Sequence, residues 1–323
     1  ATPLPRGARS PAGARQMGAQ CSGCGPEDAG CSAPSCECSL GASPLPVKTR
    51  LRVGCCSGPL DAPIHYALAH GQYNALHVNL NWVQCPPDAG AVMSMLSAGL
   101  IDMALMYTED AVAMAAEGNP LRLCGTFVES PRTWGMYAGC LNAVRCGADL
   151  RGQTVGMSDE KGASLTISVF GDQPGWGSVL YCPRRPFATI HRAADAMARS
   201  LTRATVWERR AARHFVGMGE WDLVGLTAMP WPSLVMVASK EALYAKSGAM
   251  RHFVHFAQVV SEDFKANREG CSAEFLCQRY GLNSEEAHDF LAETSWVCQS
   301  EVDLEAVARP LEHLKRAGLI DQS

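Results

Sequence analysis

Residues 97–109 have the sequence SAGLIDMALMYTE, and this stretch decides the fold. Gly99 ends a predicted helix over residues 89–98, because glycine readily adopts the left-handed conformation found at helix C-termini. Residues 101–106 form a short apolar run that predicts a buried strand, and Glu109 then begins a further predicted helix. A strand between two helices at such short spacing is typical of βαβ units and a parallel sheet.

The same alternation of strands and helices continues on both sides of this stretch. Further predicted strands are residues 48–56, 77–83, 121–128, 154–157, 187–190, 204–207 and 234–239. Further predicted helices are residues 63–70, 162–170, 192–199, 249–267, 273–280, 284–294 and 304–317. Two α/β halves followed by helices predict two lobes with a cleft between them. Ligands of open α/β sheets bind beyond the carboxyl ends of the strands.

Length and composition are those of a globular protein. The 323 residues are enough for two compact units, and 47% apolar with 19% charged residues is an ordinary balance. The net charge of −4 offers no basic excess for phosphates, so nucleic acid is not a predicted partner. No segment approaches the roughly 20 apolar residues of a membrane helix, so we predict a soluble protein without membrane insertion.

Residues 1–48 are predicted to be a disordered tail. They are rich in Pro, Gly, Ala, Ser and Cys and hold too few large apolar side chains to offset the entropy of ordering. The tail lacks the apolar region of a secretory signal, and its first 26 residues contain arginines and no acidic residue, as transit peptides do. We predict a cytoplasmic location, with an organelle as the alternative.

Five of the fifteen cysteines lie in this tail. Cys21 and Cys24 form one C-x-x-C pair, whereas structural zinc sites use paired cysteines on two knuckles. We therefore predict no metal site, and a zinc ion bound by the tail cysteines is the alternative. Most of the other cysteines are predicted to be small buried hydrophobic residues in a reducing compartment.

A series of motifs resembles the type II periplasmic substrate-binding proteins. Residues 97–104 are similar to a segment of that family that contains an aspartate, here Asp102. The sequence most resembles the nitrate, taurine and sulfonate branch of this family, which includes the fungal hydroxymethylpyrimidine synthases. Within that branch it most resembles a eukaryotic intracellular subgroup. The other segments that carry the resemblance are residues 51–54, 63–66, 71–73, 108–109, 125–131, 134–135, 149–156, 207–208 and 230–233.

The resemblance spans about residues 49–320 and implies a two-lobed α/β fold of the type II periplasmic-binding-protein kind, with a helical C-terminal region. It implies one lobe from residues 49–137 and 234–323, and a second from residues 138–233. It also implies that a small organic ligand binds in the interlobe cleft and that the lobes close on it. Without an export signal or lipobox, a transporter partner is not implied, and we predict a monomer.

The candidate ligand-binding residues follow predicted strands or stand at helix starts. A tryptophan can stack on a flat ring, a glutamate can accept from a cationic or amide group, and two serines flank a helix N-terminus that suits an anion. Helix capping is the alternative role of Thr108 and Glu109, core packing that of Trp134, and hinge packing that of Trp231. The full set is Ser57, His65, Thr108, Glu109, Ser130, Trp134, Ser158, Ser164, Trp207, Glu208 and Trp231.

A binding protein is favoured over an enzyme. The synthase resemblance implies a lysine that carries pyridoxal phosphate, a histidine donor and a cysteine-rich iron site. The lysine position falls on Met106 and the histidine position on Asp110, and no cysteine cluster lies near Met236. A methionine forms no Schiff base, and no nucleophile elbow, zinc-protease helix or P-loop is present.

We therefore predict no catalytic residue and no cofactor. The aromatic residues and Glu208 favour a small heterocycle such as a thiamine-pyrimidine precursor, and a sulfonate-like compound stays open. A synthase of thiamine biosynthesis and an interaction protein without a ligand are the alternative functions.

Overall fold

The structure, a computed structural model, describes residues 49–55, 58–72, 78–86, 88–158 and 161–321. Residues 47–323 form one structural unit. The predictions for residues 1–48, including the tail cysteines, and for Ser57 lie outside the described residues. Within the described part, no helix combines the length and the apolar character that crossing a membrane requires.

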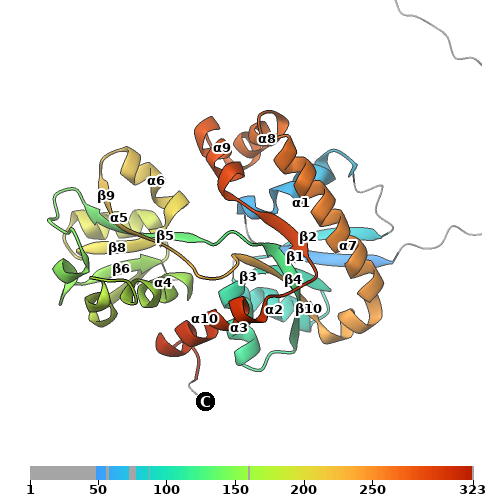
Figure 1. Cartoon of the computed structure of the whole chain (residues 1–323), viewed down its shortest axis with the longest axis horizontal. Helices are drawn as coiled ribbons and strands as arrows, with labels where there is room; N and C mark the ends of the chain where they lie inside the picture. Colours follow the sequence, from blue (N-terminus) through green and yellow to red (C-terminus); the bar gives the residue numbers. More distant parts are fainter. Residues whose placement is uncertain (1–48, 56–57, 73–77, 87, 159–160, 322–323) are drawn as a thin grey trace, which may run out of the picture. The chain divides into compact units, whose positions relative to one another are not determined.

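The first sheet of the described chain has six strands in the order β11-β4-β10-β3-β1-β2 (Figure 1). They are β1 Arg50–Cys55, β2 Asn79–Gln84, β3 Met103–Tyr107, β4 Leu121–Val128, β10 Leu234–Ser239 and β11 Trp296–Gln299. Strand β1 pairs parallel with β2 and β3, whereas β10 runs antiparallel to β3 and β4. The predicted parallel sheet is therefore mixed, because β10 returns from the second sheet in the opposite direction.

Helices cover both faces of this sheet. Side chains alternate between the faces along a strand, so Met236 of β10 packs in one core and its neighbour Val237 in another. Phe253 of α7 packs with Met236, and Val92 of α2 packs with Val237. The helices of this lobe are α1 Ala62–Ala69, α2 Ala89–Ser97, α3 Thr108–Ala116, α7 Lys240–Ala266, α8 Cys271–Tyr280 and α9 Ser284–Glu293.

Two helix starts show why the chain begins its helices where it does. The side chain of Asp88 accepts from the backbone N–H of Ala91 at 2.8 Å and so caps α2. Asn283 and Glu286 form a reciprocal capping box at the start of α9. Both caps satisfy amide groups that a helix start leaves without an internal partner.

The second sheet of the described chain has five strands in the order β7-β6-β8-β5-β9. They are β5 Thr133–Gly139, β6 Val155–Ser158, β7 Arg184–Phe187, β8 Ala204–Glu208 and β9 Trp221–Ala228. Its helices are α4 Lys161–Gly171, α5 Ile190–Ala198 and α6 Arg209–Gly217. The predicted strand at residues 187–190 is shifted, because Thr189 caps α5 and Ile190 is already helical.

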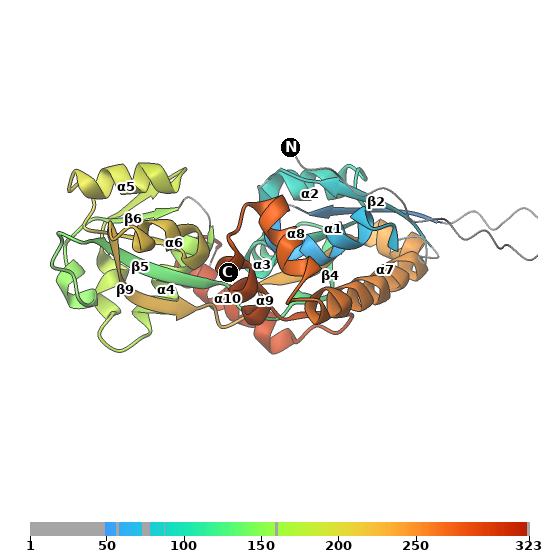
Figure 2. The ribbon, with the colours of Figure 1, turned by 90° about the horizontal axis from the view of Figure 1, so that it is seen from above.

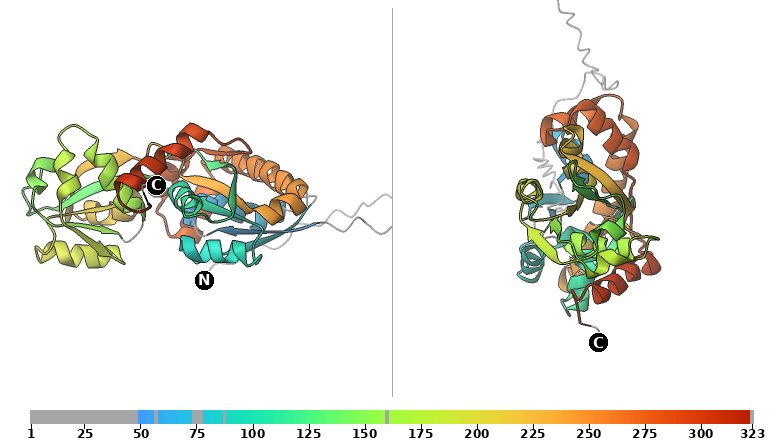
Figure 3. Two further views of the ribbon diagram at one scale, coloured as in Figure 1. Left: turned by 90° about the horizontal axis from the view of Figure 1, so that it is seen from below. Right: turned by 90° about the vertical axis from the view of Figure 1, so that its left-hand side faces the viewer.

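The chain passes between the two sheets twice, once between β4 and β5 and once between β9 and β10. Helix α10 Leu304–Arg316 packs against α3 and α4, and so contacts both lobes (Figures 2 and 3). Nδ1 of its His313 lies 3.1 Å from Oγ of Ser168, and burial lowers the pKa of this histidine. The two-lobed α/β architecture with a helical C-terminal region is confirmed. The predicted lobe boundary after residue 137 falls within β5, and the lobe boundaries stay predictions.

Candidate ligand-binding site

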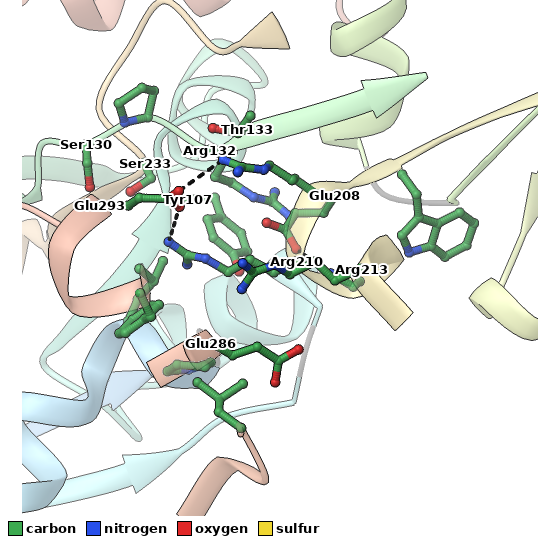
Figure 4. Close-up of a pocket in the computed structure, with 18 residues that line it drawn as sticks. Tyr107, Ser130, Arg132, Thr133, Glu208, Arg210, Arg213, Ser233, Glu286 and Glu293 are labelled. Atoms are coloured by element: carbon green, nitrogen blue, oxygen red, sulfur yellow. Dashed lines mark hydrogen bonds and ion pairs between the residues drawn. The ribbon is translucent and has the colours of Figure 1, made fainter. Parts of the chain in front are cut away.

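A cavity of about 650 Å³ lies at the carboxyl ends of β3 and β8, and Figure 4 shows the side chains around it. Small-molecule sites typically enclose roughly 300–1,000 Å³. From the six-stranded lobe the lining includes Tyr107, Ser233, Phe290 and Glu293. From the five-stranded lobe it includes Trp207, Glu208, Arg210 and Arg213. Both lobes thus contribute to one cavity, in the position that the fold predicts for a ligand.

The cavity wall combines aromatic rings with hydroxyl groups. Tyr107 stands at the end of β3 and Trp207 at the end of β8, where parallel strands present side chains to a ligand. The Oγ atom of Ser233 is buried and has no hydrogen-bond partner among the described residues. A buried hydroxyl without a partner is costly, and Ser233 is one of the residues that line the cavity.

Three arginines of α6 face acidic side chains of α9 across the cavity mouth. Arg209 donates from Nη1 to Oε1 of Glu293 at 3.0 Å, and Nη2 of Arg210 lies 3.9 Å from Oε2 of the same carboxylate. Arg213 forms an ion pair with Asp289. Because α6 and α9 belong to different lobes, these pairs connect the lobes directly. We call the five side chains the α6–α9 clasp.

Arg210 is the least compensated cation of the clasp. Its nearest carboxylate at 3.9 Å is already shared with Arg209, which is closer. The guanidinium lies over the ring of Phe290, with 4.4 Å between its carbon and the ring centroid. Burial lowers the pKa of Arg210, against the raising effect of the Glu208 and Glu293 carboxylates. Nη2 of Arg210 also donates to Oγ1 of Thr294 at 3.5 Å, so its ion pair with Glu293 is longer than that of Arg209 and shares the same carboxylate.

The carboxylate of Glu109 lies behind the cavity and joins both connecting segments. It is 1% exposed, accepts from Nη1 of Arg132 at 3.2 Å and accepts from Nε1 of Trp231 at 3.0 Å. The Arg132 guanidinium in turn lies over the ring of Tyr107 at 4.0 Å and that of Trp134 at 4.8 Å. Since Arg132 precedes β5 and Trp231 precedes β10, one buried charge fixes both crossings.

Three of the predicted ligand residues come together at the cavity: Ser130, Trp207 and Glu208. Ser130 accepts through Oγ from the N–H of Ser295 at 3.0 Å. Glu208 caps α6 by accepting from the N–H of Ala211 at 3.2 Å. Their contacts with a ligand remain predictions.

The structure places the other predicted residues outside the cavity lining. Trp134 is fully buried in the core of the five-stranded lobe, and Thr108 donates to the carbonyl of Pro232. Glu109 and Trp231 contact each other as described above. The hydroxyl of Ser158 is buried without a partner among the described residues, and Ser164 is half-buried on α4.

His65 lies in a separate polar cluster of the six-stranded lobe. Its Nε2 is 3.3 Å from Oδ2 of Asp61, and Arg279 donates to its Nδ1 at 3.0 Å. Ser57 lies outside the described residues, so its place is not described. Ligand contacts of His65 and Ser57 stay predictions.

The arginines of α6 are the main feature that sequence reasoning missed. Arg209, Arg210 and Arg213 follow directly on the predicted strand at residues 204–207. Their position at the carboxyl end of a strand is the signal that points to them, because such ends face the ligand in this kind of sheet. Only Ala212 and Phe215 of this short helix are buried, so few apolar residues mark it in the sequence.

Solved structures of periplasmic binding proteins have the same fold. The CA3427 gene product of Candida albicans, described as having the generic periplasmic binding protein fold, aligns with a TM-score of 0.70 at 19% identity, over 85% of this chain and 92% of its own. The alkanesulfonate-binding SsuA of Xanthomonas axonopodis pv. citri bound to MOPS gives 0.66 at 16% identity, over 85% and 95%. The aliphatic sulphonate binding SsuA of Escherichia coli gives 0.66 at 17%, over 84% and 91%.

These likenesses confirm the predicted type II periplasmic-binding-protein fold. A family model described as NMT1/THI5 like matches residues 59–258, and the chain belongs to this family. No curated protein matches the sequence.

The described residues do not fit pyridoxal phosphate at the position that a synthase uses. Met106 is 2% exposed, pairs with Val235 across β3 and β10, and packs in an apolar core. No lysine is among the described residues that line the cavity. Within the same described ranges, no group of three His, Cys, Asp or Glu side chains is arranged to hold a metal ion.

Proposed function

We propose that this protein binds a small organic molecule in the cavity between its lobes, and that the lobes close on the molecule. The observation that carries the proposal is the cavity wall itself, to which both lobes contribute ring, hydroxyl and charged side chains. A ligand that contacts both walls binds the closed form better than the open one and so shifts the population toward it. Two of the similar solved structures are those of the sulfonate-binding proteins SsuA.

The ligand class follows from the cavity wall. The Tyr107 side chain adds an aromatic surface to the cavity wall, and Glu208 offers an acceptor for an amino group. The arginines of the clasp suit a sulfonate or a carboxylate. A thiamine-pyrimidine precursor and a sulfonate-like compound are therefore both candidate ligands.

The clasp supports a closing motion because its pairs exist only when α6 and α9 approach. Exposed ion pairs contribute about 0.2–1 kcal/mol each, so three pairs bias the closed form by at most a few kcal/mol. Such a bias is small enough for a ligand of ordinary affinity to decide the state. We infer that the protein acts as a monomer in the cytoplasm or in an organelle. It would bind its ligand there without a transporter partner.

Thermal unfolding of the full chain tests the proposal against pyrimidines, sulfonates, amino acids, nitrate and pyridoxal phosphate. A ligand at 100 times its dissociation constant adds about 2.7 kcal/mol to the free energy of unfolding. We expect a clear rise in melting temperature with one chemical class. A rise with pyridoxal phosphate alone would support the synthase, and no rise with any compound would overturn the proposal in favour of an interaction protein.

A further inference from the structure

Helix α10 is held on both sides of the hinge between the lobes. It packs against α3 of the six-stranded lobe and α4 of the five-stranded lobe, and its Val307 and Leu314 belong to an apolar core that both lobes share (Figure 1). Nη1 of Arg309 also donates to the carbonyl of Pro230, in the crossing between β9 and β10, at 3.2 Å. A rotation of one lobe against the other must therefore loosen some of these contacts.

His313 lies where α10 meets both this crossing and the five-stranded lobe. Its ring contacts that of Trp231, with 5.6 Å between the centroids, and its Nδ1 lies 3.1 Å from Oγ of Ser168 on α4. Ser168 is buried, and Trp231 donates to the buried Glu109 carboxylate of α3. One imidazole thus connects α10 with α4, with the crossing and, through Trp231, with α3.

The charged groups around this imidazole favour its neutral form. They are Arg316 and Glu312 of α10, Asp172 just after α4 and, behind the Trp231 ring, Glu109 with Arg132. Asp172 is already paired with Arg316, and Glu109 with Arg132. Burial lowers the pKa of His313, and Arg316 lowers it further, against the raising effect of Asp172 and Glu312.

Acid should therefore weaken the docking of α10. Because the docked form lowers the pKa of the imidazole, it binds fewer protons than the undocked form. Docking is at full strength above the ordinary histidine pKa of about 6.5 and weakens as the pH falls below that value. At pH 5.5, one unit lower, the weakening reaches at most about tenfold. The Ser168 hydroxyl can turn to accept from a protonated ring, so burial and Arg316 set the direction.

Pro310 gives α10 a point at which it can separate. It is buried inside the helix and has no N–H, so one backbone hydrogen bond of the helix is missing there. This gap lies between Arg309, which holds the crossing, and His313, which contacts α4. The part of the helix after Pro310 can therefore leave α4 while the part before it stays on the crossing.

We propose that α10 is an acid-released strap across the hinge, and that protonation of His313 releases this strap from α4. The structure contains both the docked strap and the α6–α9 clasp, so both hold the same arrangement of the lobes. Release should favour separation of the lobes. The strap itself needs no ligand, and only its effect on affinity rests on the proposed function.

Hydrogen exchange of the full chain, followed by mass spectrometry, tests the strap without a ligand. We expect the protection of residues 304–316, corrected for the intrinsic exchange rate at each pH, to fall about three- to tenfold between pH 7.5 and pH 5.5. Residues 249–266 of α7, in the core of the six-stranded lobe, are the internal reference and should keep their protection.

Two variants assign the effect. His313→Gln should abolish the fall in protection, because its amide does not titrate and can still bond Ser168. His255→Gln, at an exposed position of α7, is the matched control and should show the wild-type fall. Melting temperatures at pH 7.5 show whether each variant folds; if His313→Gln does not, the comparison of the two wild-type segments still decides. The affinity for the tightest compound of the panel should fall by up to the same factor in the wild type, and not in His313→Gln.

The outcomes separate the strap from the proposed function. Equal falls in residues 304–316 and 249–266 would indicate a general loss of stability in acid and overturn the inference. A fall below about twofold, or an equal fall in His313→Gln, would overturn it as well. A fall confined to residues 304–316, with no binding of any compound, would support the strap and contradict only the proposed function.

Discussion

The substitution Arg132→Met should destabilise the protein by about 3–5 kcal/mol, the cost of removing one partner from a buried ion pair. The Glu109 side chain is 1% exposed and the Arg132 side chain 11% exposed, so little water can replace the guanidinium. Methionine keeps the apolar part of the contact with Tyr107 and Trp134. The loss is therefore mainly that of the positive charge beside a buried carboxylate.

A double-mutant cycle isolates this term. Glu109→Gln removes the negative charge but still accepts from Nε1 of Trp231. The double variant should therefore recover a large part of the loss, with a coupling energy of about 2–3 kcal/mol between the two positions. Urea unfolding of the full chain, followed by circular dichroism, measures all four corners of the cycle.

Arg309→Met is the control for this cycle, because Arg309 also contacts a connecting segment, through the carbonyl of Pro230, but is half-exposed. Its cost should stay within about 0.5 kcal/mol, as for most surface substitutions. A cost of Arg132→Met below about 1 kcal/mol, or a double variant that costs the sum of the singles, would refute the buried-charge reasoning.

Three further predictions follow from the clasp and the two lobes. In titrations at low salt, Arg213→Glu should weaken ligand binding by up to about fivefold, and the double variant with Asp289→Arg should restore it. If the effects were as large at high salt, their origin would not be electrostatic. Burial opposes the charged form of Asp102, but hydrogen bonds from Arg52 outweigh it and lower the pKa of this carboxyl. The stability that the charged Asp102 carboxylate contributes should be present above the ordinary aspartate pKa of about 3.9 and lost as the pH falls further. The urea midpoint of Asp102→Asn should therefore fall less on acidification than that of the wild type, and an equal fall would contradict this role. Gly162→Ala should cost about 1–3 kcal/mol in urea unfolding, because its Cβ would lie 2.7 Å from Trp134; no loss would show that the ring can move.

The regular part of the fold could be predicted from the sequence where apolar runs are bounded clearly. The sequence predicts a strand over residues 121–128, and β4 has these bounds. Strand β9 was not predicted, because it is an edge strand in which Leu223 and Leu226 are exposed while Trp221 is buried. Strand β5 was also not predicted, because it contains Gly135 and glycine is disfavoured in strands.

The candidate site could be predicted only in part, since its contacts join residues far apart in the chain. The bond between Trp231 and Glu109 spans 122 positions and gives no local pattern. Strand ends are visible in the sequence, and so Trp207 and Glu208 were found. The clasp was missed because Arg209 and its neighbours form a mostly polar helix, whose partner helix follows about 75 residues later and after a strand of the other sheet.

The central claim is that the interlobe cavity is the place where a small molecule binds. Ala211 lines the cavity and is exposed on α6, so Ala211→Trp fills the cavity without disturbing a core. Ala198→Trp, at an exposed position on α5 outside the cavity lining, is the matched control. Calorimetric titration of the tightest compound from the panel should give the wild-type affinity for Ala198→Trp and a loss of at least about 100-fold for Ala211→Trp. Equal affinities for both variants would contradict the claim and place the ligand elsewhere.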